Sequence, residues 1–118
     1  MAGLSDHTFT KRDRLKKRSE FLDLSRQGKK IQNRLFIIFY APGRQSSSRL
    51  GITVARKVGN AVARNRVKRI VREYYRLNRY RLKGAWDISL IAKKAAADSS
   101  THTIHNAIGT LFEKISDL

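Results

Sequence analysis

Residues 55–73 read ARKVGNAVARNRVKRIVRE, and this stretch decides how the chain folds. Gly59 marks the end of a loop. Asn60 is a favourable helix N-cap, because its side-chain oxygen can accept a hydrogen bond from a backbone N–H in the first turn. A long helix over about residues 61–79 is therefore predicted. At 100° per residue its apolar side chains fall within one narrow arc, which predicts that this side packs against a core. The arc contains Ala63, Val67, Ile70, Val71 and Tyr74.

The opposite side of this predicted helix is basic. Four cations spaced by four residues form one row along it: Arg64, Lys68, Arg72 and Arg76. Successive members of the row rise by about 6 Å along the helix axis, which is close to the spacing of phosphates along a nucleic-acid strand. The planar guanidinium of arginine can hold a phosphate through two hydrogen bonds. The pattern favours a folded face that binds a polyanion over a solvated surface helix.

The whole chain carries a large positive charge. Its 118 residues include 26 Lys and Arg but 9 Asp and Glu, which gives a formal net charge of +17. Six of the cations fall in residues 11–18 and eleven in residues 56–83, where Glu73 is the one acidic residue. Charges of one sign this close together destabilise a free protein unless a partner neutralises them. We therefore expect a polyanionic partner rather than a solvated basic surface or a disordered basic arm.

Length and composition limit the class of protein. A chain of 118 residues is the size of one domain, and residues 1–13 lack periodicity and predict a flexible lead-in. The absence of Cys excludes a disulfide framework, a zinc ribbon and a thiol nucleophile. The longest apolar run, residues 35–41, is far shorter than the roughly 20 residues of a membrane helix. The basic N-terminus also lacks the apolar segment of a secretory signal, so the expected location is the cytoplasm.

Two further helices are predicted on either side of the basic one. Residues 18–27 predict a short helix that ends near Gly28. Its predicted inward-facing side chains are Phe21, Leu22 and either Leu24 or Ser25. Residues 103–115 predict a final amphipathic helix. Its apolar stripe consists of Ile104, Ile108, Leu111 and Ile115.

Three strands are predicted between these helices. Residues 34–40 are mostly β-branched or aromatic and contain neither Gly nor Pro. Because both faces of this strand are apolar, it should be central in the sheet and covered on at least one side. Residues 50–55 predict a second strand that forms a hairpin with the first, and residues 87–92 predict a third. Together these elements indicate a small α+β domain with helices packed on a sheet.

The sequence lacks the usual signatures of an enzyme with its own active site. It contains neither the Gly-rich phosphate loop that ends in Gly-Lys-Ser/Thr nor the Gly-x-Ser-x-Gly nucleophile turn. Carboxylates are scattered, without a close pair for acid–base catalysis. His102 and His105 have no third metal ligand nearby, so they are predicted to be exposed or helix-capping side chains. Any catalysis is therefore expected to reside in a partner.

The basic stretch also resembles the signature of a known family. The run RNR at residues 64–66, followed by VKR at residues 67–69 and then Arg72, is similar to the signature of the bacterial ribonuclease P protein family. Further segments resemble that family in the same order: residues 33–36, 49–52, 56–57 and 87–94. The resemblance extends over about residues 12–115, nearly the whole chain.

The resemblance implies a fold and a division of labour. The fold would be a small two-layer α+β sandwich of order αβββαβα, similar to a ribosomal protein, with a mixed central sheet and the Arg-rich helix as a crossover. A catalytic RNA subunit with Mg²⁺ would hydrolyse the phosphodiester that releases the 5′ leader of precursor tRNA. The protein would be a single RNA-binding domain over residues 1–118. It would break no bond itself, hold no metal, and need neither a membrane nor an obligate protein partner.

Two sets of binding residues follow from the resemblance. The basic helix and the loop before it would bind the RNA subunit through Arg56, Lys57, Asn60, Arg64, Asn65, Arg66, Lys68, Arg69 and Arg72. A cleft between the first helix and the sheet would hold the single-stranded leader through Arg12, Arg14, Lys16, Phe21, Phe36 and Phe39. Aromatic rings suit a single strand, because bases of any identity can stack on them.

The leader cleft leaves its exact lining open. Strand alternation puts Phe39 on one face, with Leu35 and Ile37, and Phe36 on the other, with Ile38 and Tyr40. The alternation does not show which face forms the cleft. Phe21 and Phe39 match family positions in the cleft, although both could instead be ordinary core residues. The family usually has a second aromatic residue one turn after Phe21. This chain has Ser25 there, which predicts weaker stacking or a greater reliance on Phe39.

Three other functions fit part of the pattern. A ribosomal or other structural RNA-binding protein would share the basic helix but would need no single-strand cleft, and the RNA it binds would distinguish it. A helix-turn-helix DNA-binding protein fits less well, since strands rather than a helix and a tight turn precede the basic helix. A self-sufficient nuclease would need metal ligands that the sequence lacks.

Overall fold

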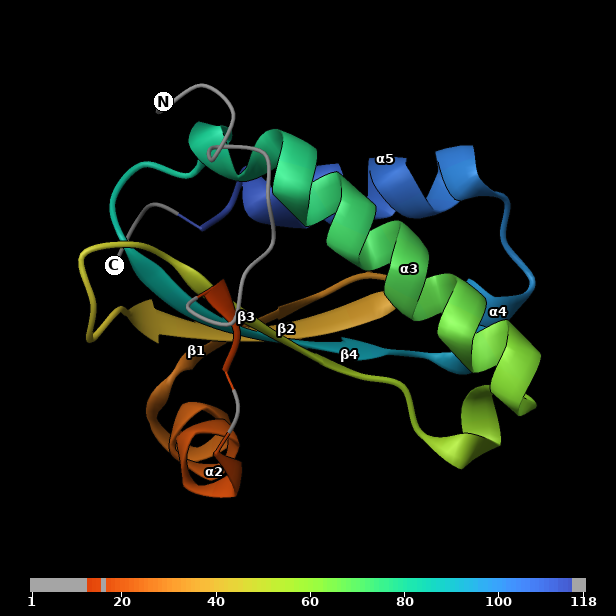
Figure 1. Ribbon diagram of the computed structural model, residues 1–118, viewed down its shortest axis with the longest axis horizontal. Coiled ribbons are helices and arrows are strands. Elements are labelled where there is room, and N and C mark those ends of the chain that lie inside the picture. The colour runs from red at the N-terminus through yellow and green to blue at the C-terminus, as the bar shows by residue number, and fades with distance from the viewer. Residues whose placement is uncertain (1–12, 16, 116–118) are drawn as a thin grey trace.

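Figure 1 shows a computed structural model of the chain, which describes residues 13–15 and 17–115. The elements in chain order are α2 (Arg18–Gln27), β1 (Lys29–Gln32), β2 (Phe36–Pro42), β3 (Arg49–Thr53), η2 (Arg56–Val58), α3 (Ala61–Asn78), η3 (Arg79–Arg81), β4 (Trp86–Ala92), α4 (Lys94–Ala97) and α5 (Thr101–Phe112). The expected order αβββαβα is confirmed, with α4 added before the last helix. Residues 1–12 of the predicted lead-in lie outside the described residues, whereas Asp13 is buried and forms an ion pair with Arg79.

The four strands of the described chain form one mixed sheet in the order β1-β2-β4-β3. β2 pairs antiparallel with both β1 and β4, while β3 pairs with β4 in parallel. The predicted central position of β2 is confirmed. The prediction that residues 50–55 form a hairpin with β2 is wrong, because β4 lies between β2 and β3. A parallel pair needs a crossover connection rather than a tight turn, and α3 provides it.

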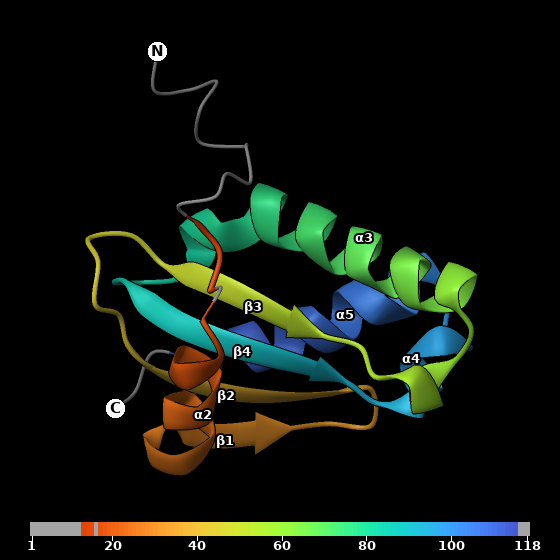
Figure 2. The same ribbon diagram turned by 60° about the horizontal axis from the view of Figure 1, so that its bottom comes forward.

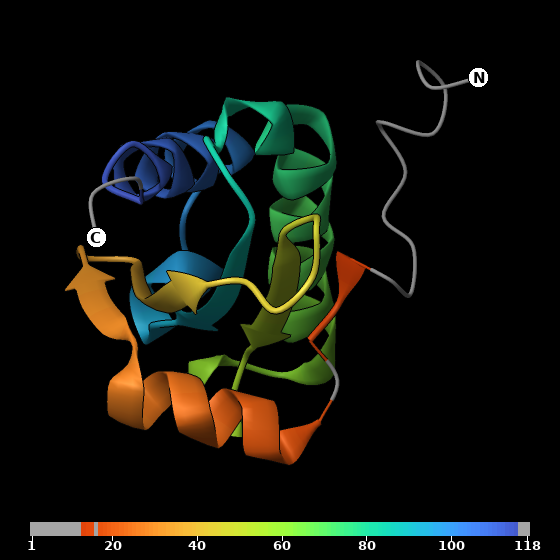
Figure 3. The same cartoon turned by 90° about the vertical axis from the view of Figure 1, so that its left-hand side faces the viewer.

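The two faces of the sheet are covered by different helices. α3 and α5 lie on one side and α2 lies on the other, as Figure 1 and Figure 3 show. Side chains alternate along a strand, so every second residue of β2 and β4 enters the core beneath α3 and α5. In the register Ile38 lies opposite Leu90 and Tyr40 opposite Ile88, and all four side chains are buried. The two helices complete this core with Val67, Val71, Ile104, Ile108 and Leu111.

α3 follows the predicted pattern closely. The side chain of Asn60 accepts a hydrogen bond from the backbone N–H of Ala63 at 2.9 Å, which confirms the predicted N-cap. The predicted apolar arc is buried except for Ala63, which lies in the first turn and is half-buried. Tyr75 is also fully buried and widens the arc. This broad apolar side fixes the rotation of the helix about its axis, and the basic side therefore faces outward.

α2 contacts the other face of the sheet through a narrow stripe. Leu24 rather than Ser25 is buried, and the predicted inward orientation of Leu22 is wrong, because that side chain is 38% exposed. The ring of Phe21 rests directly on Gly51 of β3. A Cβ atom added to Gly51 would come within 2.4 Å of two ring carbons, so this close approach requires glycine.

Arg49 of β3 ties α2 to the sheet. The residue is only 9% exposed, and its guanidinium donates two hydrogen bonds to the Asp87 carboxylate of β4, at 3.0 and 2.8 Å. A third nitrogen, Nη1, lies 2.8 Å from Oε2 of Glu20 on α2. The hydrogen bonds to Asp87 raise the pKa of Arg49 above its ordinary value, so the charge that holds the two carboxylates together is permanent. One arginine therefore joins α2, β3 and β4.

Two short elements do not follow from the residue pattern, although the order implied by the resemblance includes the first of them. β1 has a single apolar residue, Ile31, in its four positions, which is too few to show strand alternation. Its extended conformation is stabilised by antiparallel pairing with β2, and its own sequence pattern does not predict a strand. α4 is one helical turn long. Within the described ranges, no helix combines the length and the apolar character needed to cross a membrane.

Candidate RNA-binding surfaces

The nine predicted RNA-subunit contacts, called here the α3 basic face, all lie on η2, at the N-cap of α3 or on α3 itself. This face consists of Arg56, Lys57, Asn60, Arg64, Asn65, Arg66, Lys68, Arg69 and Arg72. Three of its six helical members are exposed and three are half-buried. Arg56 and Lys57 are exposed on η2, which Gly59 separates from the Asn60 cap. Figure 2 shows that α3 and α2 lie on opposite sides of the sheet.

Arg64 and Arg66 are held in place by backbone carbonyls. Arg64 Nε donates to the carbonyl of Gly59 at 3.1 Å, and Arg66 Nη2 donates to the carbonyl of Ser99 at 2.9 Å. Arg66 thereby links α3 to the segment that leads into α5. A guanidinium has five N–H donors, so a single bond to a carbonyl leaves it able to bind a phosphate. These contacts restrict the side chains before any ligand arrives.

The fourth member of the basic row differs from the other three. Arg76 Nη2 lies 2.9 Å from a carboxylate oxygen of Glu73, one turn earlier on α3. This ion pair is partly exposed and lowers the net charge of that turn. Arg64, Lys68 and Arg72 therefore contribute more net positive charge to the surface of α3 than Arg76 does.

The register of the sheet shows which side of β2 is available to a ligand. Phe39 lies opposite Ser89 on β4, and Ser89 lies opposite Gly51 on β3. Because Phe21 of α2 rests on Gly51, Phe39 is on the same side of the sheet as α2, together with Ile37. Ile37, Phe39 and Phe21 are all half-buried. We call this surface, with these three side chains, the α2 face of the sheet.

Phe36 points to the opposite side. Its side chain is 0% exposed and belongs to the core beneath α3 and α5. The prediction that Phe36 binds the leader is therefore wrong, because an enclosed ring offers no surface on which a base can stack. The two outcomes are linked by strand alternation: once Phe39 lies on the α2 face, Phe36 must lie in the core.

The other predicted leader contacts lie at the start of the described chain. Arg14 is exposed, and its backbone pairs with Leu50, the neighbour of Gly51 in β3. Arg12 and Lys16 lie outside the described residues. The structure thus brings Arg14 close to the strand on which Phe21 rests.

Lys30 is a further cation on the α2 face that the sequence analysis missed. Its Nζ lies 5.9 Å from the centre of the Phe39 ring. The two residues are opposite each other in the β1–β2 register. The contact between Lys30 and Phe39 depends on the pairing of β1 with β2. The sequence of β1 alternates too little for that strand to be predicted.

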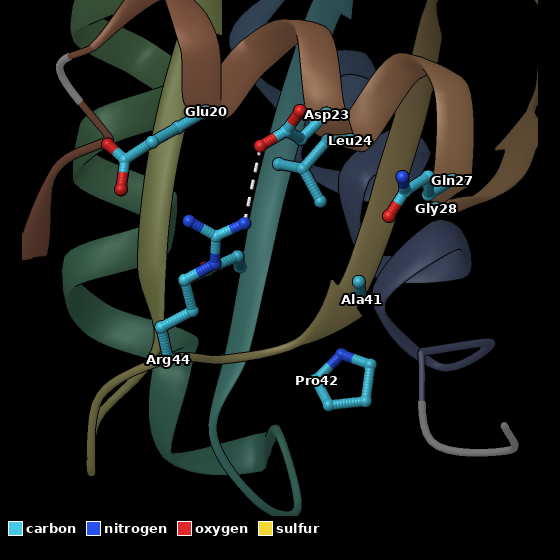
Figure 4. A pocket seen from close by; sticks show the side chains of 9 residues that line it. Glu20, Asp23, Leu24, Gln27, Gly28, Ala41, Pro42 and Arg44 are labelled. Atoms are coloured by element: carbon cyan, nitrogen blue, oxygen red, sulfur yellow. Dashed lines mark hydrogen bonds and ion pairs between the residues drawn. The ribbon is translucent and has the colours of Figure 1, made fainter.

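A pocket of about 210 Å³ opens on one flank of α2, as Figure 4 shows. It is lined by Glu20, Asp23, Leu24, Gln27, Gly28, Ala41, Pro42, Arg44 and Asp87. Its lining includes three carboxylates, and the one guanidinium, that of Arg44, pairs with Asp23 at 3.3 Å. Such a lining does not suit a polyanion. Since the pocket takes one flank of α2, Ser25, one turn after Phe21, lies toward the other flank.

The two histidines of α5 do not form a metal site. His102 is exposed, and its Nε2 lies 3.2 Å from Nδ2 of Asn106. His105 is half-buried, with its ring centre 5.4 Å from that of Tyr74, so it packs against α3 rather than capping the helix. Among the described residues, no group of three or more His, Cys, Asp or Glu side chains could hold a metal ion.

Comparison with known proteins identifies the family. A family model described as Ribonuclease P matches residues 9–116. The chain belongs to this ribonuclease P family. It is 46% identical over 114 residues to the ribonuclease P protein component of Desulfatibacillum aliphaticivorans, a match that covers 97% of each chain. It is also 47% identical over 112 residues to that of Desulforapulum autotrophicum, with 95% of this chain and 96% of the relative covered.

Solved structures of the ribonuclease P family have the same fold. The Staphylococcus aureus RNase P protein superposes with a TM-score of 0.81 at 32% identity, over 88% of this chain and 95% of that one. The RNase P protein from Thermotoga maritima gives a TM-score of 0.81 at 33% identity, over 88% and 98%. As a member of the family, the chain is a subunit of the ribonuclease P endoribonuclease and assists processing of the 5′ leader of precursor tRNA. This membership implies a partner RNA subunit.

Proposed function

We propose that the α3 basic face binds the RNA subunit and that the α2 face of the sheet receives the 5′ leader of precursor tRNA. The RNA subunit hydrolyses the phosphodiester, and the protein acts in the bacterial cytoplasm with no obligate protein partner. One observation carries this proposal: two chemically different surfaces lie on opposite sides of one sheet. Cations are displayed on α3, while half-buried rings, Phe21 and Phe39, lie beside α2.

The α3 basic face has the properties of a phosphate-binding surface. Five of its cations lie on α3, and two of these, Arg64 and Arg66, are already oriented by backbone carbonyls. Contacts of this kind supply affinity that tolerates any base sequence. They suit a large folded RNA, whose backbone offers many phosphates in a fixed arrangement.

The α2 face of the sheet has the properties of a single-strand site. The partly accessible rings of Phe39 and Phe21 can stack on bases without regard to their identity. Lys30 and Arg14 supply positive charge nearby. Arg12 and Lys16 are included in the proposal on the basis of the sequence alone. A leader is single-stranded and varies in sequence, so stacking with scattered phosphate contacts fits its chemistry.

The proposal assigns Mg²⁺ to the RNA subunit. Like charges repel, so the cation-rich α3 basic face disfavours a divalent cation, whereas RNA phosphates attract one. The protein would therefore contribute by neutralising backbone charge and by positioning the substrate. Its own side chains would not touch the reacting phosphodiester.

Cleavage of precursor tRNA by separated and recombined subunits tests this function. The protein alone, the RNA subunit alone and the mixture are compared at low salt with Mg²⁺. We expect no cleavage by the protein alone and single-site cleavage whenever the RNA subunit is present, with the mixture most active at low salt. Metal-dependent cleavage by protein that has been freed of RNA would overturn the division of labour.

A further inference from the structure

The C-terminal end of α3 carries an exposed aromatic ring outside the two surfaces described above. Tyr80 lies in η3 and is 72% exposed. All the other Phe, Tyr and Trp side chains of the described chain are buried or half-buried. A single exposed apolar residue is ordinary on a protein surface, so the surroundings of Tyr80 decide whether it has a role.

Tyr80 continues the basic row of α3. It is the fourth residue after Arg76, the last member of the row that begins at Arg64, and it lies in the turn that directly follows the end of α3 at Asn78. The hydrogen bonding of α3 extends to Arg79, whose N–H donates to the Tyr75 carbonyl, and η3 follows without an intervening loop. Successive members of the row rise by about 6 Å. A nucleic-acid strand that follows the row therefore reaches Tyr80 one step beyond Arg76.

The turn that carries Tyr80 is fixed at both ends. Arg79 Nη1 lies 2.8 Å from Oδ1 of the buried Asp13. After the ring, the Leu82 N–H donates to the Arg79 carbonyl at 3.0 Å, and the Leu82 side chain is buried. Arg81 Nε lies 3.4 Å from the Tyr80 hydroxyl oxygen, and its guanidinium carbon lies 5.9 Å from the ring centre. These contacts hold both the turn and the Tyr80 ring in place.

The charge around the ring is positive. Arg81 and Lys83 are exposed beside it, whereas the charge of Arg76 is paired with Glu73 and that of Arg79 with Asp13. Cations are favoured at a helix C-terminus by the helix dipole, which accounts for part of this charge but not for an exposed ring among the cations. Aromatic side chains next to arginine or lysine are the arrangement with which proteins bind unpaired nucleotides.

We propose that Tyr80 and Arg81 form a stacking platform for an unpaired nucleotide of the RNA subunit, at the end of the phosphate-binding row on α3. Tyr80 stacks on the base, and Arg81 contacts the adjoining phosphate. The RNA subunit rather than the leader is the ligand, because the platform continues α3, whereas the α2 face lies across the sheet. This inference rests on the proposed function of the α3 basic face.

Affinity for the RNA subunit tests the platform. The dissociation constant of the full chain for the isolated RNA subunit is measured for wild type, Tyr80→Ala, Tyr80→Phe and Arg81→Ala over a range of salt concentrations. Tyr80→Ala should weaken binding by about 5- to 100-fold, the range for loss of one base–aromatic stack, without changing the salt slope. Tyr80→Phe retains the ring and should bind like wild type. Arg81→Ala should flatten the salt slope by about one unit.

Three results would overturn the platform or its assignment. Unchanged affinity for Tyr80→Ala, with a weakened Arg69→Ala as the positive control, removes the platform and leaves the proposed function intact. Unchanged affinity for both variants removes the proposed function itself. Unchanged assembly with weaker binding of precursor tRNA by the holoenzyme assigns the nucleotide to the tRNA instead. If Tyr80→Ala unfolds at lower urea than wild type, Tyr80→Leu replaces it, since leucine keeps apolar bulk without the aromatic face.

Discussion

The two helices on either side of the sheet use arginine in opposite ways. On α3, Arg69 and Arg72 are exposed and available to a partner. Beneath α2, Arg49 is almost buried and bound by the carboxylates of Asp87 and Glu20. All three arginines contribute equally to the net charge of the chain. A count of cations therefore overstates the size of the binding surface, because some of the cations hold the fold together.

The difference between the two regions has an energetic basis. A solvent-exposed arginine costs little to hold and little to remove, since water and salt screen its charge. A buried arginine has lost its hydration, so its carboxylate partners must compensate for that loss. Removing the buried cation would leave the buried Asp87 carboxylate without the guanidinium that holds it, and Glu20 would lose its link to the sheet. Variants at the two kinds of site should therefore separate stability from RNA binding.

The largest expected effect is on stability, for Arg49→Met. This change breaks the buried network and should lower the free energy of unfolding by about 3–5 kcal/mol. Urea denaturation followed by circular dichroism measures the loss. Arg69→Ala is the matched exposed control and should lie within about 0.5 kcal/mol of wild type. Equal unfolding free energies for the two variants would show that the buried Arg49 contributes no more to stability than the exposed Arg69.

The next effect is on assembly with the RNA subunit, for Arg69→Ala and Arg66→Ala. Loss of one charge-assisted hydrogen bond is worth roughly 1.5–3 kcal/mol, so each substitution should weaken binding about tenfold or more. The salt dependence of the dissociation constant should also flatten by about one unit for each phosphate that the variant no longer binds. Titration of the RNA subunit with each variant over a range of salt concentrations measures both quantities.

The same pair of variants also separates charge from structure. Arg66→Ala additionally removes the hydrogen bond to the Ser99 carbonyl and should cost about 1 kcal/mol of stability. Arg69→Ala should leave stability unchanged. If only Arg66→Ala weakens binding, the α3 basic face acts through local structure and not through its bonds to phosphate.

A third prediction concerns the α2 face, where Phe39→Ala should reduce the preference of the holoenzyme for precursor over mature tRNA. Only the precursor has a single strand to stack on the ring, and one stack is worth about 1–3 kcal/mol, so the preference should fall roughly 5- to 100-fold. Equilibrium binding of both tRNAs to the assembled holoenzyme measures it.

Two controls sharpen the result at Phe39. Phe39→Tyr keeps the ring and should retain the preference. Phe36→Ala opens the core, should cost about 3–5 kcal/mol of stability, and should affect both tRNAs together. If Phe39→Ala behaves like Phe36→Ala, then Phe39 is a core residue and the leader binds elsewhere.

The smallest expected effect is a gain, for Ser25→Phe. Ser25 is exposed one turn after Phe21, and its hydroxyl donates to the Leu22 carbonyl of its own helix, at 2.9 Å. An aromatic ring there can add a stack on the leader, but ordering the new side chain offsets part of the gain. We expect precursor binding to tighten by about 2- to 5-fold, with mature tRNA unchanged. An equal shift for both tRNAs would show that the leader does not run along α2.

α3 was predictable because its determinants are close together in the sequence. The Asn60 cap, the apolar arc and the basic row all lie within residues 60–76. Helix geometry alone places residues with this spacing on an apolar side and a basic side. The α2 face was less predictable because it depends on which strands are neighbours. Phe39 could not be told from Phe36 until the register placed it opposite Ser89, which in turn lies opposite Gly51.

The sequence by itself determined the three main helices, the buried and basic sides of α3 and the family to which the chain belongs. Each of these is encoded in local spacing or in a contiguous signature. Tertiary structure decided that β4 separates β2 from β3, that Phe36 is enclosed, and that Arg49 holds Asp87 and Glu20. These features join residues that are far apart in the chain. Burial and charge compensation in the folded chain determine which of these residues pair, and the periodicity of the sequence does not reveal the pairs.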